Sequence, residues 1–579
     1  MPSTTDLLNR LRSFVRSESD AQQRAIEQQW AQPLAERVAR GWAIEGLTVD
    51  HFEKNIVRMY CDTNDSRFRE GDLLVLHRGN PHDPLNLHVD LIYDGETELE
   101  ATLIHGNPTM FAATPEGWIA DQDWFNSSSF YLSALDSVAD SLRGRSIILP
   151  LLQGALIPKI DYARYERVAE SLAESGLNES QIESVAMAYA ADHLHLIQGP
   201  PGTGKTLMLA HLARLLVADG QRVLVTALTH RAIQNALSKI SKVDPDISVC
   251  KIGESRHAAD LDVPNFENFD DSQFGDLNGG YVVGATPFAL QSKRLINVEF
   301  DVVLFDEASQ ITLPLAIMGM LAGNKYIFIG DENQLAPVTV FSKEDAPPSI
   351  FSYLSGRGNE TMLNITYRLN DILADWPNRA FYDQKLISSP EAAKRRLSLS
   401  NNFSRWDFVL DPTLPAVFLD LCQRNTTIRS RREAEVVVEL LQALLGHNLP
   451  PNDVGVVVPY RAQSRLIRSL LRRNIGDESI WSKIAVDTVE RMQGQEREVI
   501  IVSFTTASPA FTAQMADFLL QPQRLNVAVT RPRTKLILIG SHRMLDADQY
   551  DPTKTEAIAL LRDLFSSCIV FTVPDGSLV

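Results

Sequence analysis

The stretch Gly199-Pro200-Pro201-Gly202-Thr203-Gly204-Lys205-Thr206 decides the fold of this 579-residue chain. A short apolar segment, 194–197, precedes it, and a helix-like apolar segment, 207–213, follows it. The order strand, glycine-rich loop, Lys-Thr and helix is typical of a phosphate-binding P-loop. Its glycines allow backbone N–H groups to surround phosphate oxygens, Lys205 neutralises their charge, and the Thr206 hydroxyl is suited to holding Mg²⁺. The sequence therefore predicts a nucleotide site whose binding residues are Gly199, Pro200, Gly202, Thr203, Gly204, Lys205 and Thr206.

Composition limits the class of protein. The four cysteines (Cys61, Cys250, Cys422 and Cys568) are scattered and form no C-x-x-C pair, which argues against a zinc module or a disulfide framework. No run of about 18 apolar residues is present, so we expect no membrane span. We expect a soluble intracellular protein, cytoplasmic or, in a eukaryote, nuclear.

The charge is unevenly distributed along the chain. The net charge of −18 would argue against a nucleic-acid partner if it were uniform. Residues 361–540, however, contain 23 Lys and Arg against 18 Asp and Glu, while the remainder is strongly acidic. Because phosphate contacts depend on the local field, an acidic protein can still present a basic channel to nucleic acid.

The hydrophobic pattern divides the chain into four parts. Residues 1–50 show a helical period and are expected to form an N-terminal helical segment. Residues 51–150 are expected to form a small antiparallel β domain, barrel-like, with a connecting helix. Apolar residues alternate with polar ones over 85–91 and 99–103, and the turn signal Asp94-Gly95 lies between these segments. From residue 151 onward short apolar strands alternate with helices, which predicts parallel α/β sheets. We expect two of them in tandem, over 151–345 and 346–579.

Two further motifs follow apolar strands in the first α/β unit. Asp306-Glu307-Ala308-Ser309-Gln310 comes directly after 302–305, so Asp306 is predicted to coordinate Mg²⁺ and Glu307 to activate the attacking water. In Gly330-Asp331-Glu332-Asn333-Gln334-Leu335-Ala336-Pro337, the Gln334 amide can both donate and accept. It is therefore a candidate sensor of the γ-phosphate.

The succession of these motifs resembles superfamily 1 helicases. The resemblance continues downstream through Thr366-Tyr367-Arg368-Leu369-Asn370, through residues 486–496, and through Asn526-Val527-Ala528-Val529-Thr530-Arg531. It covers about residues 175–545 and is strongest to the branch with the nonsense-mediated-decay RNA helicase and the related DNA replication helicase–nuclease. It implies an α/β fold of tandem RecA-like P-loop NTPase domains and ATP with Mg²⁺ as cofactors.

The resemblance also implies roles for individual residues. Gln181 matches the glutamine that reads the adenine edge, and Tyr367 matches the aromatic residue that stacks on adenine. Arg368 and Arg531 match the two arginines that reach the γ-phosphate from the second domain, and Glu496 resembles a ribose contact. The family contacts the nucleic-acid backbone at the positions of Thr229, Thr286, Pro459, Tyr460 and Thr488.

Together these observations favour an ATP-hydrolysing helicase or translocase on single-stranded nucleic acid. The resemblance implies 5′-to-3′ movement. A nucleic-acid-stimulated ATPase that acts as a clamp or a protein-remodelling factor, with little unwinding, remains an alternative, because it needs the same site. The sequence leaves open whether the strand is DNA or RNA.

Overall fold

The computed structural model describes residues 4–573 except 65, 70, 96, 259–260, 278, 342–346 and 401. The described residues divide into two compact units. The larger unit contains residues 4–11, 130–338 and 347–573, and the smaller one contains 12–129 and 339–341. Within the described residues, no helix has both the length and the apolar character needed to cross a membrane.

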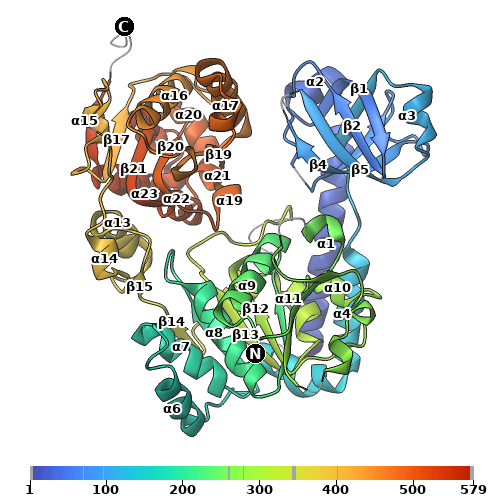
Figure 1. Ribbon diagram of the computed structural model, residues 1–579. Helices are drawn as coiled ribbons and strands as arrows, with labels where there is room; N and C mark the ends of the chain where they lie inside the picture. Colours follow the sequence, from blue (N-terminus) through green and yellow to red (C-terminus); the bar gives the residue numbers. More distant parts are fainter. Residues whose placement is uncertain are drawn as a thin grey trace. The chain divides into compact units, whose positions relative to one another are not determined.

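The smaller unit contains a closed antiparallel barrel of six strands in the order β1-β2-β5-β4-β3-β6 (Figure 1). Alternate residues of β4 and β5 are buried inside it, for example Val89 and Leu91 of β4 and Leu99 and Ala101 of β5. Gly95 donates its N–H to the Glu98 carbonyl at 2.9 Å, which closes the β4–β5 hairpin. The predicted barrel-like domain is therefore confirmed. The strands are β1 (Ala43–Glu53), β2 (Ile56–Tyr60), β3 (Leu73–His77), β4 (Leu87–Asp94), β5 (Glu98–His105) and β6 (Trp118–Gln122).

The N-terminal helical segment is shorter than expected. Helices α1 (Thr4–Trp30) and α2 (Leu34–Ala39) form as predicted, but β1 begins at Ala43. Gly41, with φ +71°, follows the C-cap of α2. A glycine in this conformation ends a helix readily, so the chain turns into the barrel before residue 50.

The first α/β domain is built on a parallel eight-stranded sheet with the order β10-β9-β11-β8-β12-β13-β7-β14. Helices α7 (Glu179–Ala190), α8 (Lys205–Ala218) and α9 (His230–Val243) pack on β7, β8, β12 and β13 in one hydrophobic core. The strands are β7 (Leu194–Gln198), β8 (Arg222–Thr226), β9 (Val249–Ile252), β10 (Asn265–Phe266), β11 (Tyr281–Gly284), β12 (Val302–Phe305), β13 (Lys325–Gly330) and β14 (Glu360–Met362).

Strand β14 lies beyond the expected boundary between the α/β units at 345/346, yet it pairs with β7 in the first sheet. Residues 345 and 346 themselves lie outside the described residues. The first sheet thus includes a short strand that sequence reasoning assigned to the second unit.

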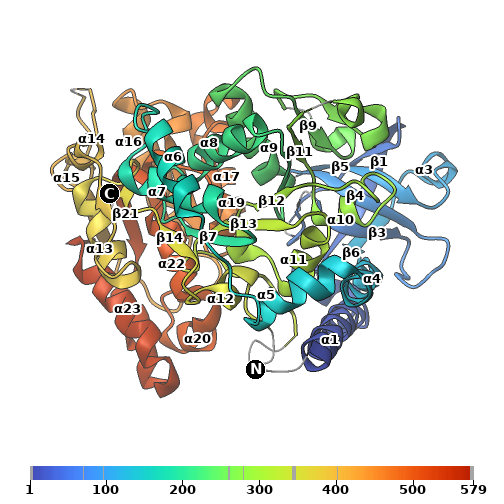
Figure 2. The ribbon, with the colours of Figure 1, turned by 90° about the horizontal axis from the view of Figure 1, so that it is seen from below.

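The second α/β domain has a parallel six-stranded sheet with the order β19-β18-β20-β21-β17-β22. This domain is the orange and red part of the chain in Figures 1 and 2. Helices cover both faces: Phe418 of β17 belongs to one core, and its neighbours Val417 and Leu419 belong to the other. The strands are β17 (Ala416–Asp420), β18 (Val454–Val458), β19 (Ala485–Thr488), β20 (Arg497–Ser503), β21 (Pro532–Gly540) and β22 (Ile569–Thr572). The predicted tandem of parallel α/β domains is confirmed.

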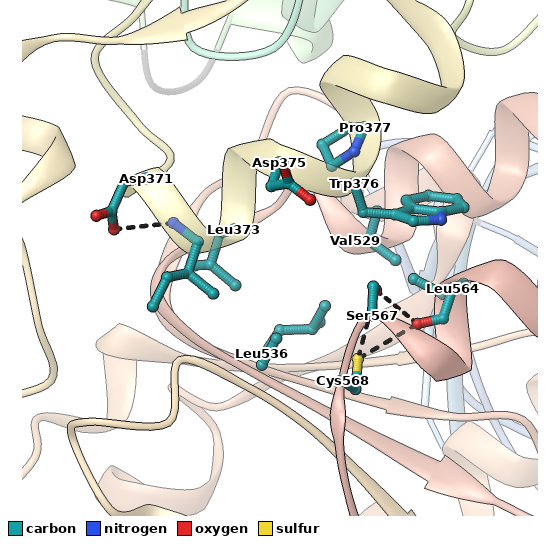
Figure 3. A pocket seen from close by; sticks show the side chains of 12 residues that line it. Asp371, Leu373, Asp375, Trp376, Pro377, Val529, Leu536, Leu564, Ser567 and Cys568 are labelled. Carbon is teal, nitrogen blue, oxygen red and sulfur yellow. Dashed lines mark hydrogen bonds between the residues drawn. The ribbon is translucent and has the colours of Figure 1, made fainter.

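An apolar cavity of about 310 Å³ lies between α13 (Asp371–Phe381), β21 and the end of α23 (Thr555–Ser566) (Figure 3). Leu373, Leu536 and Leu564 line it, and burial raises the pKa of the neighbouring Cys568 thiol to about 12. None of the residues predicted to bind nucleotide or nucleic acid lines this cavity.

Candidate nucleotide site and nucleic-acid edge

The predicted site motifs follow neighbouring strands of the first sheet. The P-loop follows β7, the Asp306-Glu307 pair follows β12, and the 330–337 segment follows β13. Because all these strands are parallel, their carboxyl ends lie at one edge of the sheet. This edge is where parallel α/β sheets bind their ligands.

The P-loop adopts a conformation that requires glycine. Gly202 and Gly204 have φ +74° and +82°, in the left-handed region. A Cβ on Gly202 would lie 2.7 Å from Thr366 Oγ1, and one on Gly204 would lie 2.6 Å from Gln181 Nε2. Lys205 Nζ donates to the Gly199 carbonyl. Helix α8 begins at Lys205 with Thr206 in its first turn, so the N-terminus of the helix adjoins the loop, as in phosphate-binding P-loops.

The two carboxylates of the Asp306-Glu307 motif lie in different surroundings. Asp306 is buried at the end of β12, where burial and the neighbouring Glu307 raise its pKa to about 7 against the opposing charge of Lys205. Glu307 takes a left-handed conformation with φ +51°, and its Oε2 accepts a hydrogen bond from Gln493 Nε2 at 3.2 Å. The structure therefore joins the predicted base to the second domain.

Gln334 belongs to a buried polar network that crosses between the two α/β domains. Asp331 Oδ2 accepts hydrogen bonds from Gln334 Nε2 and from the Tyr382 hydroxyl, each at 2.7 Å. Asn526 Nδ2 donates at 2.8 Å both to the Tyr382 oxygen and to the Asn333 carbonyl. Burial raises the pKa of Asp331, while these donors and Lys205 oppose the rise.

Sequence reasoning missed Tyr382 and gave Asn526 no role. Asn526 lies in the quoted motif that ends at Arg531, so its position was a usable signal. Tyr382 follows α13 and lies in no motif, and only the fold brings it to Asp331.

The residues predicted to hold adenine lie close together. Gln181 is buried, its Oε1 accepts from the Asn178 N–H at 3.0 Å, and its Nε2 donates to the Thr203 carbonyl at 2.9 Å. One lone pair and one N–H of this amide remain for a base edge. Asn178 Nδ2 also donates to the Tyr367 hydroxyl at 2.9 Å, and 41% of Tyr367 is exposed. A solvent-accessible aromatic ring and a fixed amide are thus held beside the P-loop.

The two predicted arginines approach the same region from the second domain. Arg368 Nε donates to Glu496 Oε2 at 2.7 Å, and its Nη1 donates to the Thr530 carbonyl at 3.0 Å. Arg531 is buried, and desolvation together with Arg368 lowers its pKa to about 9. Burial opposes ionisation of Glu496, but the nearby arginines, Arg368 first, lower its pKa overall. Glu496, predicted to contact ribose, here pairs with Arg368.

The predicted nucleic-acid residues of the first domain lie at the same sheet edge. Thr229 follows β8, is exposed, and caps α9 by accepting the Ala232 N–H at 3.2 Å. Thr286 follows β11 and stands before Pro287 at the start of α10 (Pro287–Leu290). Strand β8 adjoins β12, and the Asp306 N–H donates to the Thr226 carbonyl at 2.9 Å. The strand that leads to Thr229 is therefore bonded directly to the one that carries Asp306.

The corresponding residues of the second domain are more buried. Pro459 and Tyr460 follow β18, and Thr488 ends β19 and precedes α19 (Val489–Met492). The Tyr460 ring stacks on Phe518 at a centroid distance of 5.9 Å, and burial raises the pKa of its phenol to about 12. Its hydroxyl is buried without a hydrogen-bond partner among the described residues. The structure thus brings these positions to one edge but places the Tyr460 ring in an aromatic cluster.

Comparison with known proteins agrees with this arrangement. Two family models, each described as an AAA domain, match residues 176–273 and 276–343, and residues 347–543. The chain is 30% identical over 439 residues to the DNA replication ATP-dependent helicase/nuclease DNA2 of Saccharomyces cerevisiae, covering 69% of this chain and 28% of the relative. It is 28% identical over 427 residues to the DNA polymerase alpha-associated DNA helicase A of Schizosaccharomyces pombe, covering 63% of each.

The chain spans less than two thirds of the length of these relatives. The solved complex of arterivirus nonstructural protein 10, a helicase, with DNA aligns with 89% of this chain and 82% of its own, at 13% identity. The TM-score of this alignment is 0.40. The two matched domains, the order of their motifs and the relatives identify the family: the chain belongs to the superfamily 1 helicases.

Proposed function

We propose that the chain hydrolyses ATP to move along single-stranded nucleic acid in the 5′-to-3′ direction and to separate strands. One observation carries the proposal: residues of the domain that contains the P-loop and residues of the second α/β domain meet at Glu307. Gln493 contacts Glu307, and Arg368 and Arg531 lie at the same junction. In a site divided in this way, loss of the γ-phosphate changes how the two domains are held together.

Each residue then has a chemical task. The P-loop N–H groups and Lys205 bind the phosphates, and Glu307 orients and deprotonates the attacking water. Arg368 and Arg531 stabilise the charge that develops on the transferred phosphoryl group. Gln181 and Tyr367 hold the base, Glu496 positions Arg368 and is near the ribose, and Gln334 reports the γ-phosphate to Asp331 and Tyr382.

The oxygen donors of Thr206 and Asp306 suit Mg²⁺, which would supply charge neutralisation at the phosphates. Asp306 is buried at a strand end where a carboxylate has few water molecules to stabilise it. A neighbouring cation would favour its ionised form, so the donor set fits this ion.

We assign nucleic-acid binding to the carboxyl edges of the two parallel sheets. The residues that would contact the nucleic-acid backbone there are Thr229, Thr286, Pro459, Tyr460 and Thr488. Such contacts hold phosphates without reading sequence. We propose DNA as the substrate, because the names of the relatives describe DNA replication and DNA helicases. An intracellular location, cytoplasmic or nuclear, follows from this substrate.

The test measures ATP hydrolysis with matched DNA and RNA single strands, and strand displacement on duplexes with a 5′ or a 3′ tail. We expect stimulation by single strands, larger with DNA, and displacement only from the 5′ tail. Glu307→Gln serves as the inactive control. Stimulation without displacement would support the clamp function instead, and hydrolysis that no strand stimulates would overturn the assignment.

A further inference from the structure

Three side chains with metal-binding atoms meet in the second α/β domain, away from the nucleotide site. Asp420 ends β17, Cys422 lies two residues later, and His542 lies two residues after the end of β21. Strands β17 and β21 are neighbours in the sheet, with Asp420 in register with Gly540. One potential ligand atom from each of the three side chains lies within 4.8 Å of the others.

The backbone around these residues is fixed by the Asp420 carboxylate. Asp420 Oδ1 accepts the Cys422 N–H at 3.0 Å and the His542 N–H at 3.3 Å, and Oδ2 accepts from His542 Nδ1 at 2.6 Å. The loops are tied a second time, since Ser541 Oγ donates to the Gln423 carbonyl at 3.1 Å. Cys422 has φ +53°, a conformation that is uncommon for a residue with a side chain. The loops therefore hold the three groups together without a metal.

The position of the cluster allows an ion to enter. Asp420 is buried, Cys422 is half-buried, and the His542 side chain is 56% exposed. Three protein ligands with one side open to solvent leave a coordination position for water. The buried Asp420 thus fixes the inner side of the site, and the exposed His542 leaves the outer side accessible to solvent.

The chemistry of the donors selects the kind of ion. One sulfur, one imidazole nitrogen and one carboxylate oxygen suit a borderline-soft divalent cation, whereas Mg²⁺ and Ca²⁺ prefer oxygen. We propose that Asp420, Cys422 and His542 form a Zn²⁺-binding site. With metal–ligand bonds of about 2.0–2.3 Å, tetrahedral ligand atoms lie roughly 3.5 Å apart, so small side-chain rotations suffice.

The existing hydrogen bonds supply the outer support for this site. When the metal binds, Asp420 Oδ2 would coordinate it in place of its hydrogen bond with His542 Nδ1. Asp420 Oδ1 would keep its hydrogen bonds from the N–H groups of Cys422 and His542. Such hydrogen bonds orient a ligating carboxylate and raise metal affinity. The three ligands include neither a P-loop residue nor Arg368 or Arg531. The proposed metal site is therefore independent of the proposed helicase function.

The site would clamp the loops after β17 and β21 at the carboxyl edge of the second sheet. Strand β20 separates β21 from β18, the strand that leads to Pro459 and Tyr460. A bound ion would therefore stiffen this edge from the side opposite the predicted nucleic-acid contacts. The spacing of the cysteines argues against a zinc module. It could not predict this cluster, because Asp420 and His542 are 122 residues apart in the sequence.

The test uses the full chain, stripped of metal and free of nucleotide, with Co²⁺ and Zn²⁺ as probes. We expect one Co²⁺ per chain to produce a thiolate-to-cobalt charge-transfer band, which Zn²⁺ then displaces. An ion held by Thr206 and Asp306 has only oxygen ligands and gives no such band. Cys422→Ser is expected to abolish the band, and His542→Ala to weaken binding at least about tenfold. His51→Ala, which removes an exposed histidine of the barrel, is the matched control and should bind as the parent does.

A second measurement does not depend on the spectrum. Zn²⁺ that binds the folded chain raises its melting temperature, and this increase should disappear in Cys422→Ser and persist in His51→Ala. Absence of the band in the parent chain, a band that survives Cys422→Ser, or equal binding by the His542→Ala and His51→Ala variants would each overturn the proposal.

Discussion

The Tyr382 hydroxyl bonds to both Asp331 and Asn526, so Tyr382→Phe tests how the two α/β domains communicate. The substitution keeps the fully buried ring and removes one oxygen. It deletes a hydrogen bond to a carboxylate, worth about 1.5–3 kcal/mol, and a neutral one, worth about 0.5–1.5 kcal/mol. We therefore expect the free energy of unfolding to fall by about 2–4 kcal/mol.

The functional consequence follows from the position of this hydroxyl. Without it, two hydrogen bonds still join this loop to the second domain, from Asn526 Nδ2 to the Asn333 carbonyl and from Asn333 Nδ2 to the Phe381 carbonyl, each at 2.8 Å. Neither of them reaches the side chain of Asp331 or of Gln334. We expect basal ATP hydrolysis to survive and its stimulation by single strands to fall about tenfold, within the usual range of coupling energies.

Tyr326→Phe is the matched control. Tyr326 is equally buried, and its hydroxyl donates to the Gly323 carbonyl at 2.7 Å entirely within the first domain. It should cost about 1 kcal/mol of stability and leave stimulation unchanged. Urea denaturation and strand-stimulated ATPase assays compare the two variants. If both lose the same stability and both keep full stimulation, the network does not connect the domains.

Three further predictions concern single side chains. Glu307→Gln should lower turnover by about 10²–10⁴-fold in an ATPase assay while a nucleotide-binding assay shows retained ATP affinity, and near-parental turnover would remove its role as the base. Arg531→Lys should reduce turnover by about 10³-fold or more with ATP affinity little changed, because an ammonium cannot replace the planar guanidinium that donates to Val527 and Thr530. Burial raises the pKa of Glu433 from 4.5 to about 7. Between these pH values the folded chain keeps a proton that the unfolded chain loses, so the free energy of unfolding should fall by about 3 kcal/mol as the pH rises from 4.5 to about 7. Glu433→Gln should flatten that dependence in unfolding measurements at a series of pH values, and an unchanged slope would contradict the assignment.

Much of the fold could be predicted because its signals are local. The P-loop, the alternation that forms the β4–β5 hairpin and the apolar strands before Asp306 and Gly330 are each read within about ten residues. Once the strands are known to be parallel, no further information is needed to predict that their carboxyl ends lie at one edge of the sheet. For this reason the sequence predicts the residues of the candidate nucleotide site, and the structure places the strands that lead to them side by side.

The remaining features depend on contacts between distant residues. Pairing of β14 with β7 joins segments more than 160 residues apart, and nothing in a three-residue strand announces its partner. The same holds for Tyr382 beside Asp331 and for His542 beside Asp420. A buried polar residue needs a hydrogen-bond partner, and in such pairs the partner lies far away in the sequence. A single sequence does not show which distant residue that partner is.

Distant contacts also join the P-loop directly to the segment that carries Tyr367 and Arg368. The Tyr367 N–H donates to the Gly202 carbonyl, and Thr366 Oγ1 donates to the Pro201 carbonyl, each at 2.8 Å. The lack of a side chain on Gly202 is what lets Arg368 approach this closely. A shift of the P-loop must therefore move the segment that carries Arg368, even before its guanidinium meets a phosphate. Glycine at position 202 permits both the left-handed conformation of the P-loop, for which we propose phosphate binding, and the close contact with Arg368, so Gly202→Ala should disturb both.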